Sequence, residues 1–149
     1  MRATVLALAM LVLAVSNAAG QGKSLPSDPL TGLPLIPATD AGKGFGNKPV
    51  QMPPGRVCAS AMQGNFYPLH GITMDAASAW YASHLSGFEA VPGGARQYAF
   101  FSNSDRTILV ILTGHSGSTE ADSVAYERYR PGLSEKTVEG LASGKIVCK

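Results

Sequence analysis

The sequence predicts a small single α+β domain, built as a mostly antiparallel sheet with two helices on one face and preceded by a disordered Pro/Gly-rich tether. Three observations support this fold class. The chain has only 149 residues, prolines and glycines concentrate before residue 56, and strand-like and helix-like patterns alternate after it. A foldable part of about 94 residues suits one small core and excludes large nucleotide-binding or hydrolase folds.

The first twenty residues have the pattern of a secretory signal peptide. Arg2 is followed by an apolar run from Val5 to Val15 and then by small residues at positions 16–20. The run is too short to span a bilayer, which needs about 20 apolar residues. We therefore expect residues 1–20 to be removed and the protein to be exported to the periplasm or secreted. An uncleaved N-terminal anchor is the alternative.

Residues 21–55 are expected to form an extended tether. They hold 7 of the 10 prolines and 6 of the 17 glycines, a composition typical of segments that lack a packed core. Four apolar side chains interrupt the tether, and they could either dock on a partner or pack back on the domain: Leu30, Leu33, Leu35 and Ile36.

The domain, residues 56–149, is expected to begin with a strand over 57–62, and Gly64-Asn65 and Pro68 indicate irregular backbone after it. A helix is predicted from about Met74 to Ser86, with Thr73 or Asp75 as N-cap and Gly87 as its stop. Its apolar stripe is predicted to contain Ala77, Trp80, Tyr81, His84 and Leu85.

Two β-rich runs, 97–102 and 107–113, flank a short Asn/Ser/Asp turn and predict a hairpin. The second run is apolar at consecutive positions, as in a central strand covered on both faces. A further strand is expected over 123–130.

A second helix is predicted from about Glu135 to Ser143. Ser134 is a good N-cap, and Leu133 and Val138 occupy the two positions of a hydrophobic staple. Gly144 ends this helix, and residues 146–148 are expected to return to the core as a short strand.

Cys58 and Cys148 are the only cysteines and bracket the foldable region. In an exported chain, this placement predicts one disulfide, with two free thiols or a metal pair as the alternatives. Closing a loop of about 90 residues stabilises a small domain by roughly 4–5 kcal/mol in the chain-entropy model.

Charge and motifs exclude several function classes. From Arg56 onward the basic and acidic residues balance, eight against eight, which gives no reason to expect nucleic acid or an anionic membrane as partner. The histidines at 70, 84 and 115 lack the close spacing of a zinc site. No phosphate-binding, dinucleotide or haem motif is present, so we expect no metal and no cofactor.

The string Gly114-His115-Ser116-Gly117-Ser118 resembles a nucleophile elbow but ends in Ser where that motif needs Gly. A small hydrolase that uses His115 with Ser116 or a nearby carboxylate is therefore an alternative hypothesis. The competing interpretation is a flexible turn between strands.

The segment Tyr126-Glu127-Arg128-Tyr129-Arg130 is the best candidate for a binding surface. Strand alternation places Tyr126, Arg128 and Arg130 on one face, where paired arginines beside a tyrosine suit a carboxylate or phosphate group. His115, in the loop before this strand, could line the same surface. The competing interpretation is a solvated face on which arginine stems cover tyrosine rings.

Together these features favour an exported, non-enzymatic binding or accessory module that is monomeric and recognises a protein or a small anionic ligand. A structural or assembly subunit that docks through the tether is the remaining alternative.

Overall fold

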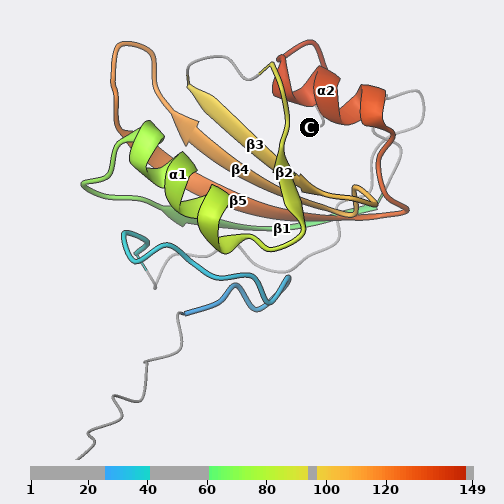
Figure 1. The fold of residues 1–149 in the computed structure, drawn as a ribbon, viewed down its shortest axis with the longest axis horizontal. Helices are drawn as coiled ribbons and strands as arrows, with labels where there is room; N and C mark the ends of the chain where they lie inside the picture. The colour runs from blue at the N-terminus through green and yellow to red at the C-terminus, as the bar shows by residue number, and fades with distance from the viewer. Residues whose placement is uncertain (1–25, 41–60, 94–96, 147–149) are drawn as a thin grey trace, which may run out of the picture.

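Five antiparallel strands form one sheet in the order β1-β5-β4-β3-β2 (Figure 1). The structure is a computed structural model, which describes residues 26–40, 61–93 and 97–146. Its elements in chain order are β1 (Ala61–Pro68), α1 (Met74–His84), β2 (Phe88–Ala90), β3 (Tyr98–Asn103), β4 (Ile108–Gly114), β5 (Ala121–Arg130) and α2 (Glu135–Ala142). The predicted α+β class with an antiparallel sheet and two helices is confirmed.

The first strand differs from the prediction. β1 pairs with β5 along its whole length, so Gly64 and Asn65, which were expected to break the strand, lie inside it opposite Glu127 and Tyr126. Pairing with a long neighbouring strand supplies the backbone hydrogen bonds that local propensity does not predict. Pro68 is the exception, because it ends the strand, and proline is usually confined to the ends or edges of a sheet.

Helix α1 begins as predicted, with the Thr73 hydroxyl accepting the backbone N–H of Ala76 at 3.2 Å. Ala77 and Tyr81 of its predicted stripe are buried. The stripe prediction is wrong for His84, which is exposed and stacks on Trp80 with 4.1 Å between ring centroids. The indole of Trp80 covers one face of the imidazole, so His84 is packed against a side chain although it lies outside the core.

Helix α2 matches its sequence signature. The Ser134 hydroxyl accepts the Thr137 N–H at 3.1 Å, which confirms the N-cap. Leu133 and Val138 are buried in the same cluster, as the staple predicts. Gly144 follows the helix at a φ of 71°, a left-handed conformation that glycine adopts without steric cost.

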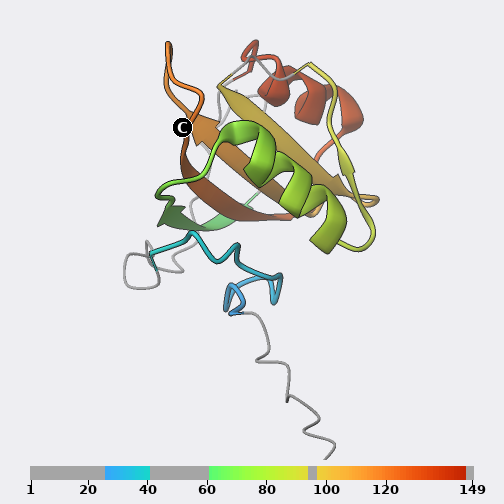
Figure 2. The same ribbon diagram turned by 60° about the vertical axis from the view of Figure 1, so that its left-hand side comes forward.

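The two helices lie on opposite faces of the sheet, and the prediction of one shared face is wrong (Figure 2). Tyr81 of α1 packs with Val110 and Leu112 of β4 on what we call the α1 face. Val138 of α2 packs with Leu109 and Ile111, which alternate with those residues and point to the other side, the α2 face. A central strand that is apolar on both faces, as β4 is, needs a cover on each side.

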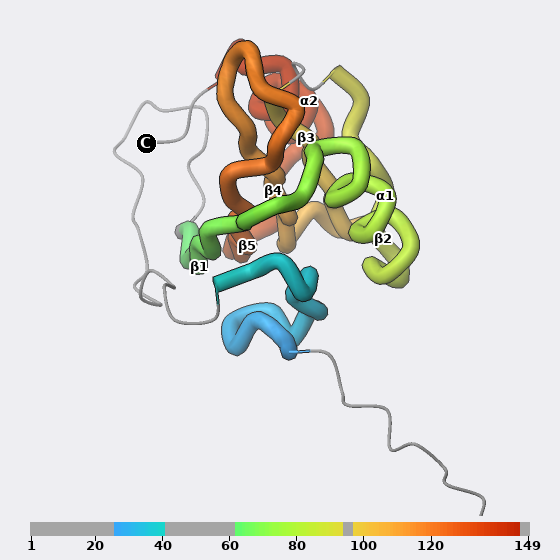
Figure 3. The backbone as a smooth tube through the Cα atoms, turned by 90° about the vertical axis from the view of Figure 1, so that its left-hand side faces the viewer, coloured from blue at the N-terminus to red at the C-terminus, as the bar shows by residue number. Residues whose placement is uncertain are grey.

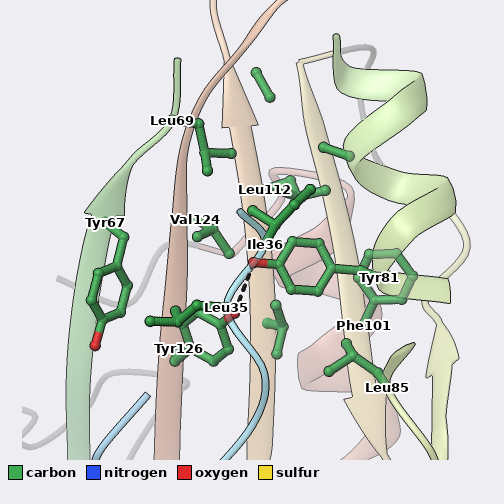
Figure 4. Close-up of a cluster of buried hydrophobic side chains, with 13 residues drawn as sticks. Leu35, Ile36, Tyr67, Leu69, Tyr81, Leu85, Phe101, Leu112, Val124 and Tyr126 are labelled. Atoms are coloured by element: carbon green, nitrogen blue, oxygen red, sulfur yellow. Dashed lines mark hydrogen bonds between the residues drawn. The ribbon is translucent and has the colours of Figure 1, made fainter. Parts of the chain in front are cut away.

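Residues 26–40, which we call the N-terminal segment, pack on the α1 face beside α1 and β1 (Figure 3). Leu35 and Ile36 are buried in the same cluster as Tyr81 and Tyr126 (Figure 4). Composition predicts an unpacked tether here, and for this part of the chain that expectation is wrong. The alternative, in which these apolar side chains pack back on the domain, is confirmed for Leu35 and Ile36.

Several predictions fall outside the described residues: the signal peptide, the remainder of the tether, the return strand beyond Ile146, and the Cys58–Cys148 disulfide. Neither helix in the described part of the chain has the length and hydropathy that a membrane span requires.

Candidate functional site

Tyr126 lies in the core rather than on a binding surface. It is fully buried, and its hydroxyl donates to the carbonyl oxygen of Pro34 at 2.7 Å. The hydroxyl of Tyr81 lies 2.7 Å from that of Tyr126 (Figure 4), and because the Tyr126 proton is already used, Tyr81 is the donor of this pair. Burial raises the pKa of Tyr81 to about 12 and raises that of Tyr126 further.

Arg128 also has a structural role, because its guanidinium group is hydrogen-bonded within the protein. Its Nη2 donates to Oε1 of Gln63 at 2.6 Å, and its Nη1 donates to the carbonyl oxygen of Leu30 at 3.3 Å. The Nε atom is buried and has no hydrogen-bond partner among the described residues. The prediction of an open anion-binding face is thus wrong for Tyr126 and Arg128, because the N-terminal segment covers them.

The other two predicted binding residues, Arg130 and His115, lie at opposite ends of the paired strands β4 and β5. Arg130 is exposed at the end of β5, where it pairs with Ala61. Ile108 of β4 lies opposite Arg128. Gly114, which directly precedes His115, is six residues further along β4, a separation of about 20 Å. The structure therefore does not bring His115 to the arginines.

His115, in the loop between β4 and β5, instead meets a carboxylate of β5. Its Nδ1 atom lies 2.8 Å from Oδ2 of Asp122, and the two side chains are 63% and 43% exposed. Ser116 and Ser118 lie in the same loop and line a cavity of about 680 Å³ together with His115 and Met74. The Ser118 hydroxyl accepts the N–H of Glu120 at 3.0 Å, so it helps to shape the turn.

A buried carboxylate, which sequence reasoning missed, fixes the N-terminal segment on the α1 face. Asp28 is fully buried. One of its oxygens accepts the Asn65 amide at 2.6 Å and the Tyr67 hydroxyl at 2.7 Å, and the other accepts the Thr31 N–H at 2.8 Å and hydroxyl at 2.6 Å. Burial, and next the hydrogen bond to Asp28, raise the pKa of Tyr67. The Asp28-Pro29 pair, with aspartate and proline at the first two positions of a turn, was the available signal.

A second carboxylate lies on the α2 face. Glu127 is partly buried and accepts the Tyr129 hydroxyl at 2.5 Å. Burial raises the pKa of Glu127, and the hydrogen bond from Tyr129 only partly opposes this. Burial, followed by the charge of Glu127, raises the pKa of Tyr129 as well.

A groove of about 580 Å³ opens between β2, the end of β3 and α2, and we call it the β2–α2 groove. Its apolar lining includes Val91 and Val138, which belong to the α2-face cluster. Its charged lining consists of Glu89, Glu135, Glu139 and Arg106. The three glutamates are exposed, so the groove has an apolar floor and an acidic rim.

Arg106 fixes the position of α2 beside the turn that joins β3 and β4. Its Nε donates to the carbonyl oxygen of Leu133 at 2.9 Å, and its own carbonyl oxygen accepts the Leu133 N–H at 2.9 Å. It holds a φ of 56°, which is rare for a residue other than glycine. No local sequence pattern predicts this turn conformation or β2, so the groove was not predicted.

Comparison with known proteins returned no matching family model, no matching curated protein and no matching solved structure.

Proposed function

We propose that this protein is an exported, non-enzymatic binding module whose ligand is a basic, partly apolar segment of another protein. The observation that carries the proposal is the β2–α2 groove, where Glu89, Glu135 and Glu139 surround an apolar floor. Its volume of about 580 Å³ falls within the range of ligand sites, roughly 300–1,000 Å³.

The two helical glutamates suit such a ligand because of their spacing. Glu135 and Glu139 are four residues apart on α2, so both project from the same side of the helix. Glu89 approaches from β2 on the opposite side of the groove. A lysine or arginine side chain between them would meet carboxylates from both walls, while its neighbours contact Val91 and Val138.

The proposal replaces the anionic ligand that the arginine pattern predicts. Arg128 is hydrogen-bonded to Gln63 and Leu30, and Tyr126 is buried, so neither side chain is available to bind an anion. The partner is instead expected to carry positive charge.

The test uses the full mature chain and an array of peptides that differ in net charge. Basic peptides with apolar neighbours should shift the backbone amide signals of Glu89 and Glu135 in NMR titrations, and added salt should weaken the effect. Glu135→Lys combined with Glu139→Lys should abolish binding. Glu120→Lys, an exposed carboxylate outside the groove, is the matched control. Equal binding by both variants contradicts the proposal.

A small hydrolase is the second candidate, and the His115–Asp122 pair is the observation that favours it. A carboxylate on Nδ1 orients a histidine so that Nε2 can act as a base, as in serine hydrolases. Ser116 is the residue next to it that could serve as nucleophile. A fluorophosphonate probe should then label Ser116, and His115→Ala should prevent labelling; an unlabelled wild-type protein eliminates this candidate.

A further inference from the structure

The N-terminal segment contacts the sheet as a bound peptide would. Asp28 is held by Asn65 and Tyr67 of β1. The carbonyl oxygens of Leu30 and Pro34 accept from Arg128 and Tyr126 of β5. Leu35 and Ile36 supply the apolar contact in the cluster around Tyr81.

The segment also holds a shape of its own. The N–H of Asp28 donates to the Leu33 carbonyl at 2.8 Å, and the N–H of Gly32 donates to the Asp28 carbonyl at 2.7 Å. Ser27 and Pro34 form a β-bridge within the segment. This turn presents the Asp28 carboxylate and the Leu35-Ile36 pair as one unit.

The connection between the segment and β1 is longer than the structure needs. The N–H of Asp40 donates to the Pro68 carbonyl at 3.1 Å, so the segment ends beside the last residue of β1. The chain must then return to Ala61, the first residue of that strand, over about 24 Å. Residues 41–60 provide twenty residues, with a maximum reach of about 70 Å.

We propose that the N-terminal segment is exchangeable, and that the α1 face of a second copy of this chain is its alternative docking surface. Reciprocal exchange between two copies would reproduce every contact of Asp28, Pro34 and Ile36 and would give a closed, two-fold symmetric dimer. The twenty-residue connection gives the cis segment an effective concentration in the millimolar range, so the chain is a monomer at micromolar concentration.

Shortening the connection tests the exchange directly. Deleting residues 41–56 leaves four residues between Asp40 and Ala61, with a maximum reach of about 17 Å. This reach is less than the 24 Å span, so the segment can dock only on another copy. Light scattering should show a doubled mass for this variant. Replacing residues 41–56 by sixteen Gly/Ser residues is the matched control and should stay monomeric.

Two further measurements keep the proposal testable if the shortened chain does not fold. Two full-length chains with different tags, refolded together at about 1 mM, should form dimers that carry both tags. Ile36→Asp in both chains should prevent these dimers, because it places a charge in the buried cluster. A folded monomer from the shortened chain, or the absence of mixed dimers of the full-length chain, overturns the proposal.

Discussion

The Asp28 carboxylate accepts a hydrogen bond from the Tyr67 hydroxyl at 2.7 Å, although 39 residues separate the two in sequence. Both groups are buried, and Asn65 donates to the same carboxylate oxygen. This contact joins the N-terminal segment to β1 and makes the segment part of the folded domain.

Asp28→Ala should therefore destabilise the whole domain. The substitution leaves the Asn65 amide and the Tyr67 hydroxyl buried without an acceptor, at a cost of about 3 kcal/mol. Urea denaturation of the mature chain measures the change. Glu120→Gln, at an exposed position, should change the free energy of unfolding by less than about 0.5 kcal/mol. Equal midpoints for the two variants would show that the segment is dispensable.

Alkaline pH should destabilise the protein through its buried tyrosines. Burial raises the pKa of Tyr81 from 10.0 to about 12, so the native state holds this proton after the unfolded chain has lost it. The unfolded state is then favoured as the pH rises from about 10 to 12, by about 1.4 kcal/mol for each unit of difference in pKa. The pKa values of Tyr67, Tyr126 and Tyr129 are raised as well and act in the same direction.

Tyrosinate absorbance at 295 nm checks this prediction in a Tyr98→Phe variant, which removes the exposed tyrosine and leaves the four buried ones. The four remaining tyrosines should ionise together with unfolding, and circular dichroism should change in the same pH range. Ionisation near pH 10 with an intact fold would contradict the burial of these rings.

Glu127→Gln should alter the pH dependence of stability in the acid range. Burial raises the pKa of Glu127 above its usual 4.5, so the native state binds this proton more tightly than the unfolded chain does. The raised pKa of Glu127 therefore stabilises the native state below about pH 4.5, and this contribution is lost as the pH rises through the raised native pKa. The glutamine variant lacks this loss and keeps an acceptor for the Tyr129 hydroxyl. Its free energy of unfolding, relative to wild type, should be more favourable at pH 7 than at pH 4.

Local patterns predicted most of the fold. The caps at Thr73 and Ser134 depend on a few neighbouring residues and stand where the sequence places them. The apolar run of β4 predicted a strand covered on both faces, but the helices were assigned to one side. Strand alternation could have shown the two apolar faces, because Leu109 and Val110 necessarily point in opposite directions.

The candidate site depended on long-range contacts, and these were not predictable from composition. Tyr126 and Arg128 share a strand face, as alternation predicts, but the polar groups that cover them come from Leu30 and Pro34. The proline-rich composition of the N-terminal segment does not indicate this packing, because a few buried side chains decide whether such a segment docks. The β2–α2 groove likewise requires β2 and the unusual backbone of Arg106, for which no local signal exists.

Two substitutions of Arg106 separate the role of its side chain from the strain of its backbone. Arg106→Ala and Arg106→Gly both remove the hydrogen bond from Nε to the Leu133 carbonyl, so both should loosen α2 and reduce stability. Alanine retains the steric cost of a φ of 56°, about 1–2 kcal/mol, whereas glycine adopts this conformation freely. The greater entropy of glycine in the unfolded chain offsets part of that advantage. Urea denaturation should therefore show the glycine variant to be more stable than the alanine variant by about 0.5–1 kcal/mol. An alanine variant that equals or exceeds the glycine variant would mean that the turn relaxes out of the left-handed region once the side chain is removed.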